Sequence, residues 1–188
     1  MVPRRPLAAV LVALTLVGCT TASPAYPTPT AQPSPRCTPE AGGTPYPCGQ
    51  TEYEQMQERA RLYAEAETLY RRSVELRNEA LTTDSANVEA LVAIAQGQAQ
   101  EMLLADLKAD ETLQGSQFTA PWVNRLPDHS REGSVVALES CVDSSAGTLI
   151  STNGERRSGY AGIERTYYGG ASGSLKMLYI ESKLVDQC

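Results

Sequence analysis

A short apolar run near the N-terminus constrains what the rest of this chain can become. Residues 7–17 are apolar except for Thr15, Arg4 and Arg5 precede them, and Gly18-Cys19 closes the run. A run of about 11 residues is too short to cross the roughly 30 Å hydrocarbon core of a bilayer as a helix. A basic segment, a short apolar segment and a small residue are typical of a secretion signal. We therefore expect residues 1–18 to be a signal peptide and the remaining chain to fold outside the cytoplasm.

The four residues that close this run, Leu16-Val17-Gly18-Cys19, resemble the lipobox of bacterial lipoproteins. In that motif the cysteine is diacylated and becomes the mature N-terminus. Each buried methylene of an acyl chain contributes about 0.8 kcal/mol, so two chains hold a protein firmly on a membrane. The resemblance implies lipidation of Cys19 and a location at the extracytoplasmic face of the cell membrane. The alternative is an ordinary cleaved signal in which Cys19 has no role.

The charge balance argues against a nucleic-acid partner. The chain has 22 acidic and 16 basic residues, and removing residues 1–18 takes away two basic residues and no acidic one, which leaves a formal charge of −8. Such a domain would be repelled by the phosphates that dominate nucleic-acid binding and by anionic lipids. The lipid, and not charge, would then attach the protein to the membrane.

Residues 19–49 have the composition of a spacer. Eight prolines lie between Pro24 and Pro47, among many threonine, serine and alanine residues. Such a segment cannot bury enough apolar surface to fold alone, so we expect a lipidated, disordered tether over residues 19–49 and a folded domain over residues 50–188.

The remaining cysteines suggest disulfides. With Cys19 acylated, Cys37, Cys48, Cys141 and Cys188 form an even set in an oxidising compartment, and three pairings are possible. We favour Cys37 with Cys48, which closes a short loop, and Cys141 with Cys188, which attaches the C-terminus to a central strand. The chain has no CxxC pair and a single histidine, His129, so we expect neither a metal site nor a cofactor.

Helical periodicity dominates the first half of the domain. Thr51 and Glu54 have the spacing of a capping box, and apolar residues from Met56 to Leu81 recur at intervals of three and four, which predicts one long helix. Thr83-Asp84-Ser85 then offers N-cap chemistry, and a second apolar stripe predicts a second helix that runs to about Gln114. Residues 116–131, which include Trp122 and His129, are expected to form a surface loop in which neither side chain has a catalytic role.

The second half of the domain has the residue pattern of β-strands. We expect strands at residues 134–142, 148–152, 160–168 and 174–185, joined by turns that include Asn153-Gly154 and a glycine-rich segment at 169–173. Consecutive hairpins would give an antiparallel meander of about four strands. In the last strand, strict alternation places Leu175, Met177 and Tyr179 on one face and Lys176, Leu178 and Ile180 on the other.

Two helices followed by a curved antiparallel sheet resemble a group of actinobacterial secreted proteins and lipoproteins with a nuclear-transport-factor-2-like, or cystatin-like, fold. The resemblance rests on the run 136–145, on Gly173-Ser174-Leu175-Lys176-Met177 and on the terminal cysteine. Cys141, Asp143 and Cys188 match positions of that group, whereas Leu175 stands where a tryptophan is usual. The likeness implies an α+β cone and a disulfide, and it implies little about activity.

Three classes of function follow from these features. We prefer a non-enzymatic envelope lipoprotein that binds a protein or cell-wall partner, or a second copy through its sheet. A small-molecule binder or enzyme that uses the cone cavity is the second class, with Asp143, Tyr167 and Tyr168 as the candidate pocket residues, although Asp143 is better placed to cap a turn. The third class is an assembly component of a secretion or conjugation system, or an exclusion lipoprotein of a mobile element.

Overall fold

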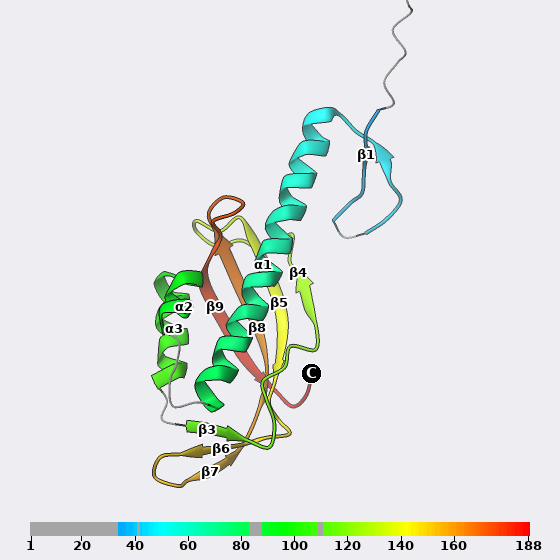
Figure 1. Cartoon of the computed structure of the whole chain (residues 1–188). Helices are drawn as coiled ribbons and strands as arrows, with labels where there is room; N and C mark the ends of the chain where they lie inside the picture. Colours follow the sequence, from blue (N-terminus) through cyan, green and yellow to red (C-terminus); the bar gives the residue numbers. More distant parts are fainter. Residues whose placement is uncertain (1–33, 41, 83–87, 109–110) are drawn as a thin grey trace, which may run out of the picture. The chain divides into compact units, whose positions relative to one another are not determined.

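The computed structural model describes residues 34–40, 42–82, 88–108 and 111–188, which fold as an α+β unit (Figure 1). The predicted fold class is thereby confirmed, but its details differ. The described residues contain three helices and three antiparallel sheets, where we expected two helices and one sheet. The helices are α1 (Gln50–Thr82), α2 (Val88–Ile94) and α3 (Gly97–Lys108). None of the described helices is long and apolar enough to span a membrane.

The largest sheet has four strands in the order β4-β5-β8-β9, all antiparallel. Helix α1 lies across one face of this sheet, and α2 and α3 lie along β9 at its edge (Figure 1). The alternation of β5 sends Val136, Leu138 and Val142 into the core under the helices, so the intervening residues face outward. The strands are β4 (Val123–Arg125), β5 (Val136–Asp143), β8 (Ala161–Gly169) and β9 (Lys176–Val185).

A second sheet of three strands lies beyond the C-terminal end of α1, in the order β3-β6-β7 (Figure 1). Its strands are β3 (Glu111–Gln114), β6 (Thr148–Ser151) and β7 (Arg156–Ser158). The Asn153-Gly154 turn does join two strands, as its sequence predicts, but its partner strand is β7 and not β8. The chain then passes close to itself at Gly159, where an added Cβ would lie 2.0 Å from the Ser144 carbonyl oxygen. Only glycine fits this crossing between the two sheets.

The second predicted helix is wrong in extent. The chain forms α2, breaks, forms α3 and ends in β3, so that part of the expected helix is a strand. The break occurs at Gly97, whose φ of 58° lies in the left-handed region. The preceding residue, Gln96, donates its backbone N–H to the Met177 carbonyl oxygen of β9 at 2.9 Å. This contact with the edge of the sheet therefore replaces the hydrogen bond that a continuous helix would make. The N-cap predicted at residues 83–85 lies outside the described residues.

Two side-chain amides extend the backbone pairing of the sheets. Gln98 donates to the Ile180 carbonyl oxygen at 3.1 Å and accepts from the Ile180 N–H at 2.8 Å. Asn78 makes the same two-bond contact with the backbone of Phe118, at 2.8 and 2.7 Å. Each amide thus acts as one residue of a neighbouring strand, and together they attach α3 to β9 and α1 to the segment before β4.

The alternation predicted for the last strand fails at one position. Tyr167 pairs with Tyr179 whereas Tyr168 pairs with Met177, so Leu178 is the extra residue of a bulge. The bulge reverses the alternation, and Met177 and Ile180 therefore both lie in the core. In strict alternation, these two residues would lie on opposite faces.

The folded unit begins earlier than expected. Strands β1 (Arg36–Cys37) and β2 (Tyr46–Pro47) form a hairpin closed by the Cys37–Cys48 disulfide. The hairpin contacts the first turns of α1, where Glu40 pairs with Arg59 at 2.7 Å and Tyr46 donates to Glu52 at 2.6 Å. The part of the predicted tether from Ser34 to Gly49 therefore belongs to the domain, because a disulfide and contacts with α1 replace the missing core.

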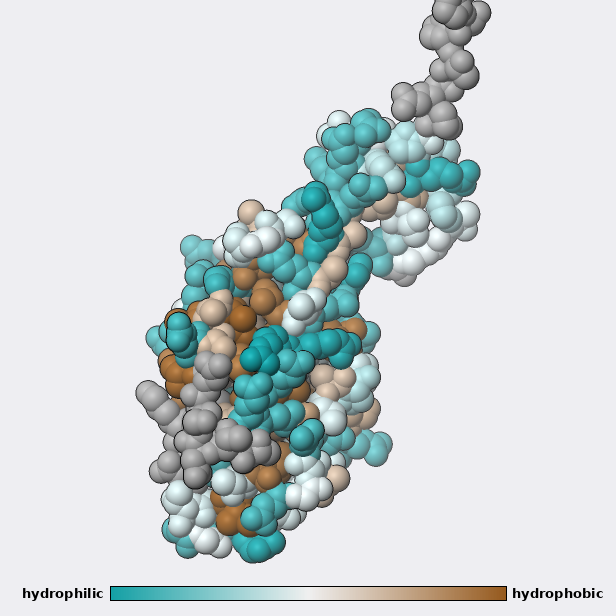
Figure 2. Space-filling model, in the orientation of Figure 1, coloured by the Kyte–Doolittle hydropathy of each residue, from teal (hydrophilic) through white to brown (hydrophobic). Residues whose placement is uncertain are grey.

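Helix α1 contributes one buried stripe of side chains to the core. It begins at Gln50, one residue before the predicted capping box, and Tyr63, Ala66, Tyr70 and Leu76 are buried against the sheet. Apolar residues also appear at the surface between α1 and the shorter helices (Figure 2). On the polar face, Glu67 pairs with Arg125 of β4 at 3.1 Å.

Candidate functional site

A buried ion pair joins α1 to the inner face of the four-stranded sheet. Arg77 of α1 donates through Nη1 to Glu164 Oε1 of β8 at 2.8 Å, and the Tyr70 hydroxyl donates to Glu164 Oε2 at 3.1 Å. The side chains of Arg77 and Glu164 are only 5% and 9% exposed. Charges this deep are retained only where each has a partner, so the pair fixes how α1 lies on the sheet.

The sequence carries a signal for Arg77 that the choice of candidate pocket residues missed. Tyr63, Ala66, Tyr70, Ser73 and Arg77 recur at intervals of three and four, which places the arginine on the buried stripe of the helix. A charged residue at a stripe position is the informative exception to an amphipathic pattern. Its partner has no such signal, because Glu164 lies 87 residues further along the chain.

Several buried polar atoms near this pair have no hydrogen-bond partner among the described residues. They are Arg77 Nε and Nη2, the Tyr168 hydroxyl and Thr166 Oγ1. Asp106 of α3 also approaches this guanidinium, but its Oδ2 lies 3.9 Å from Arg77 Nε, beyond hydrogen-bond distance. A buried donor without an acceptor costs about 1–3 kcal/mol. The unused Arg77 atoms therefore mark a place where an acceptor would be bound favourably.

A cavity of about 90 Å³ opens beside Arg77, between the helices and the three-stranded sheet. Its walls combine charged residues with two aromatic rings, Phe118 and Tyr160, whose centroids lie 5.6 Å apart in an edge-to-face arrangement. At one side Arg157 of β7 pairs with Glu111 of β3 through two hydrogen bonds, at 3.1 and 2.6 Å. The residues that line the cavity are Arg77, Leu81, Asp106, Glu111, Phe118, Leu149, Arg157 and Tyr160.

Burial shifts the titration of groups around the ion pair and the cavity. It raises the pKa values of Tyr70, Tyr160 and Tyr168, and the negative charge of Glu164 raises all three further. Burial also raises the pKa of the Asp106 carboxyl, although 46% of this side chain is exposed. For Arg77 burial alone would lower the pKa, but Glu164 and Asp106 outweigh it and the pKa rises. The guanidinium therefore keeps its charge at the cavity wall.

The three residues predicted to form a pocket are not brought together. Tyr167 and Tyr168 are neighbours on β8 and point to opposite faces, so only Tyr168 lies in the core under the helices. Tyr167 lies on the outer face, where its hydroxyl donates to Glu181 at 3.4 Å. The prediction of a pocket at Asp143, Tyr167 and Tyr168 is therefore wrong, because it ignored the alternation of a strand.

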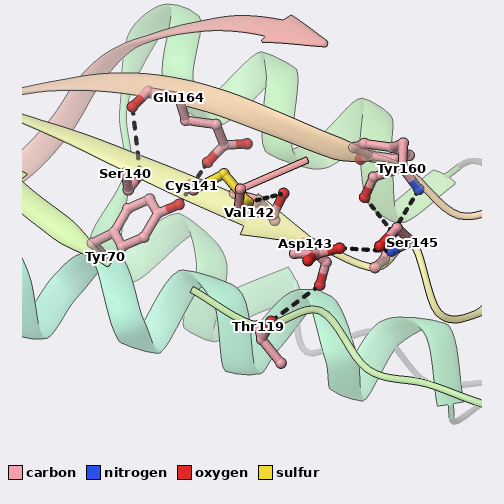
Figure 3. Close-up of a disulfide and its surroundings, with 11 residues drawn as sticks. Tyr70, Thr119, Ser140, Cys141, Val142, Asp143, Ser145, Tyr160 and Glu164 are labelled. Carbon is pink, nitrogen blue, oxygen red and sulfur yellow. Dashed lines mark hydrogen bonds between the residues drawn. A yellow bond between two sulfur atoms is a disulfide. The ribbon is translucent and has the colours of Figure 1, made fainter. Parts of the chain in front are cut away.

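Asp143 instead caps the turn after β5 (Figure 3). Its carboxylate accepts the Ser145 backbone N–H at 2.8 Å, and this contact with Ser145 lowers the pKa of the carboxyl. Its backbone exchanges two hydrogen bonds with Thr119, each 2.9 Å long. The turn-capping role that we weighed against the pocket role is the one its contacts support.

The outer face of the sheet holds a different set of charges. The Arg131 guanidinium lies over the Tyr167 and Tyr179 rings, at 5.6 and 5.0 Å from their centroids, and pairs with Glu181 at 3.1 Å. On the same face Arg165 pairs with Glu139 at 2.7 Å. These four charged side chains are therefore already paired with one another, unlike the free edge of Arg77.

Both favoured disulfides are present. Cys37 is bonded to Cys48, and Cys141 is bonded to Cys188, which ties the C-terminus to the outward side of β5 (Figure 3). The other two residues singled out from the sequence lie away from the cavity walls. His129 is exposed in a turn closed by its backbone N–H and the Leu126 carbonyl oxygen, and Trp122 is half-buried before β4.

Comparison with known proteins does not identify a family for this chain. No family model and no curated protein sequence matches this chain. Among solved structures it is similar to the crystal structure of the intermembrane space region of the chloroplast protein ARC6, with 12% sequence identity and a TM-score of 0.43 over 66% of this chain and 96% of that chain. At this identity and score, the likeness supports no conclusion about function.

Proposed function

We propose that this protein is a lipoprotein anchored through Cys19 to the extracytoplasmic face of a cell membrane, where its folded unit binds a ligand or partner and does not catalyse a reaction. One observation carries the proposal. Of the five cysteines in the chain, four are paired in two disulfides, and the one left over is the cysteine of the lipobox-like motif. Disulfides persist in oxidising compartments, which agrees with export of the chain.

The finer description of the fold is part of the same proposal. A long helix across a four-stranded antiparallel sheet, with a disulfide from β5 to the C-terminus, agrees with a nuclear-transport-factor-2-like cone. Folds of this kind serve many functions, so the fold alone selects none of them. A protein or cell-wall partner, or a second copy bound through the outer face of the sheet, would suit a domain held at a membrane surface.

The anchor is tested by replacing Cys19 with alanine and following the protein through membrane fractionation. We expect Cys19→Ala to move from the membrane fraction to the soluble fraction and to lose incorporation of an alkyne-labelled fatty acid. Cys48→Ser is the matched control, since it removes another cysteine near the N-terminus and should leave the protein lipidated and on the membrane. Retention of Cys19→Ala on membranes with unchanged labelling would refute the proposal.

A second candidate function, small-molecule binding, is favoured by one observation of the folded unit. The cavity beside Arg77 combines unused buried donors with aromatic and aliphatic walls, as ligand sites do. This candidate is compatible with the anchor, because a lipoprotein can present a ligand-binding domain at the membrane.

A further inference from the structure

We propose that the cavity beside Arg77 binds the carboxylate of a small organic acid, with the acid's apolar part between Phe118 and Tyr160 and the two leucines of the wall. The inference rests on the ligand-binding role proposed for the folded unit and is independent of the lipid anchor. The geometry of the Arg77 guanidinium and the residues that line the cavity indicate this class of ligand.

The unused edge of Arg77 has the shape that a carboxylate fits. Its Nη1 is occupied by Glu164, whereas Nε and Nη2, which project their N–H groups side by side, have no acceptor among the described residues. Two parallel donors match the two oxygens of a carboxylate in a fork-to-fork contact. A single carbonyl group would satisfy this edge less completely.

The same cavity contains an internal example of this contact. Arg157 presents its Nε and Nη2 to the two carboxylate oxygens of Glu111, at 3.1 and 2.6 Å. Arg157 therefore binds a carboxylate through Nε and Nη2, the same two atoms that have no acceptor in Arg77. A ligand carboxylate bound to Arg77 would make the same two-bond contact that Glu111 makes with Arg157. The Arg77 contact would lie at the buried wall of the cavity, and the Arg157 contact lies at the more exposed wall.

Asp106 competes for this position. Its Oδ2 lies 3.9 Å from Arg77 Nε without a hydrogen bond, and 46% of its side chain is exposed. A carboxylate that is both too far to bond and partly in water can turn toward solvent at small cost. A bound acid would thus take the place that Asp106 only approaches, and the negative charge of Asp106 would oppose its binding.

The size and walls of the cavity set the rest of the ligand. A volume of about 90 Å³ admits a short chain or part of one ring, and Leu81, Leu149, Phe118 and Tyr160 form its apolar walls. An apolar cavity of about 150 Å³ holds benzene in another protein, so a ring bound here would fill this smaller cavity and extend through its open side toward solvent. Benzoate, which joins one ring to one carboxylate, is therefore a suitable probe, and benzamide is its uncharged analogue of nearly the same shape.

The test is a calorimetric titration of the full chain in detergent micelles, with micelles alone as the blank. We expect benzoate to bind about tenfold more tightly than benzamide, because a charge-assisted double contact is lost in the amide. Arg77→Lys should abolish this preference, since a lysine has no planar edge. Arg72→Lys makes the same change on the exposed side of the same helix, where Arg72 pairs with Glu75 and Glu79, and should change neither affinity.

Two further variants keep the proposal testable if Arg77→Lys does not fold. Asp106→Asn removes the competing charge and should tighten benzoate binding several-fold without affecting benzamide. Leu81→Trp fills the cavity from its wall and should abolish binding of both probes while the circular dichroism spectrum stays unchanged. Repeating the titration with Cys19→Ala separates this inference from the anchor, because benzoate should bind that chain equally well.

Several outcomes would overturn the inference. No saturable benzoate binding at millimolar concentrations would show that the buried edge of Arg77 does not accept a carboxylate. Equal affinity for benzoate and benzamide would show that the guanidinium does not contact the carboxylate. Weaker benzoate binding by Asp106→Asn would show that Asp106 assists the ligand and does not compete with it.

Discussion

The two faces of the four-stranded sheet use the same residue types in opposite ways. On β8, Glu164 and Tyr168 face the helices, whereas their neighbours Arg165 and Tyr167 face outward. The inner pair, Arg77 with Glu164, is 5% and 9% exposed, whereas in the outer pair Arg165 and Glu139 are 45% and 24% exposed. The distances within the two pairs are nearly equal, at 2.8 and 2.7 Å.

The comparison shows that distance alone does not measure what an ion pair contributes. On the outer face water screens both charges, and such pairs contribute about 0–1 kcal/mol. On the inner face each charge depends on the other for solvation, so removing one leaves the other buried without a counter-charge. Matched substitutions on the two faces should therefore differ in their effect on stability.

Replacing the acid of each pair with its amide should separate the two faces most strongly. We expect Glu164→Gln to lower the free energy of unfolding by about 3–5 kcal/mol, because the Arg77 charge stays buried without its partner. Glu139→Gln, the matched change on the outer face, should cost less than about 1 kcal/mol. Urea denaturation followed by circular dichroism measures both. Similar losses in the two variants would contradict the comparison.

The outer face is held instead by a covalent bond. Cys188→Ser breaks the bond to Cys141, which closes a loop with a sequence separation of 47 residues, and should lower the free energy of unfolding by about 2–4 kcal/mol. Cys48→Ser opens a loop with a separation of only 11 residues and should cost less in the chain-entropy model. Thermal unfolding of the two variants gives the order, and an unchanged melting temperature for Cys188→Ser would contradict this assignment.

The two adjacent tyrosines of β8 give the smallest and sharpest comparison. Tyr168→Phe removes a buried hydroxyl with no partner among the described residues and should stabilise the protein by about 1 kcal/mol at neutral pH. Tyr167→Phe, on the outer face, loses the hydrogen bond to Glu181 and should instead lower the free energy of unfolding by about 0.5–1.5 kcal/mol.

The same pair of variants should also differ in alkaline solution. Burial raises the pKa of Tyr168 well above its ordinary value of 10.0, so only the unfolded chain releases this proton as the pH rises past that value. The contribution of Tyr168 to stability is thus complete below pH 10.0 and is lost above it. The advantage of Tyr168→Phe over the unaltered protein should therefore grow above that pH in urea titrations, and a constant advantage would contradict the assigned burial.

The sequence predicted those features of the fold that depend on local patterns. The long helix, the turn at Asn153-Gly154 and the approximate positions of β5, β6 and β9 follow from periodicity and turn residues. Strands β3 and β4 could not be found in this way, since they have four and three residues and gain their stability from partners elsewhere in the chain. The bulge at Leu178 was equally hidden, because nothing in the alternation of β9 marks the extra residue.

The candidate site shows the same limit. Arg77 could have been recognised from its place on the buried stripe of α1, but its meaning depends on Glu164, Asp106 and the cavity wall, which come from separate elements. Asp143, Tyr167 and Tyr168 were chosen for their chemistry alone, and the geometry of β8 sends the two tyrosines apart. Chemistry-bearing residues are thus readily found in a sequence, whereas their meeting depends on the tertiary fold.

The amide of Gln98 on the edge of β9 has a consequence for how this protein behaves at high concentration. Exposed sheet edges recruit strands from other chains and so begin amyloid-like aggregation. Here Gln98 occupies both backbone groups of Ile180, and the N–H of Gln96 occupies the carbonyl oxygen of Met177. This stretch of β9 therefore has few backbone groups left to template an intruding strand, and this part of the sheet edge is protected against β-aggregation.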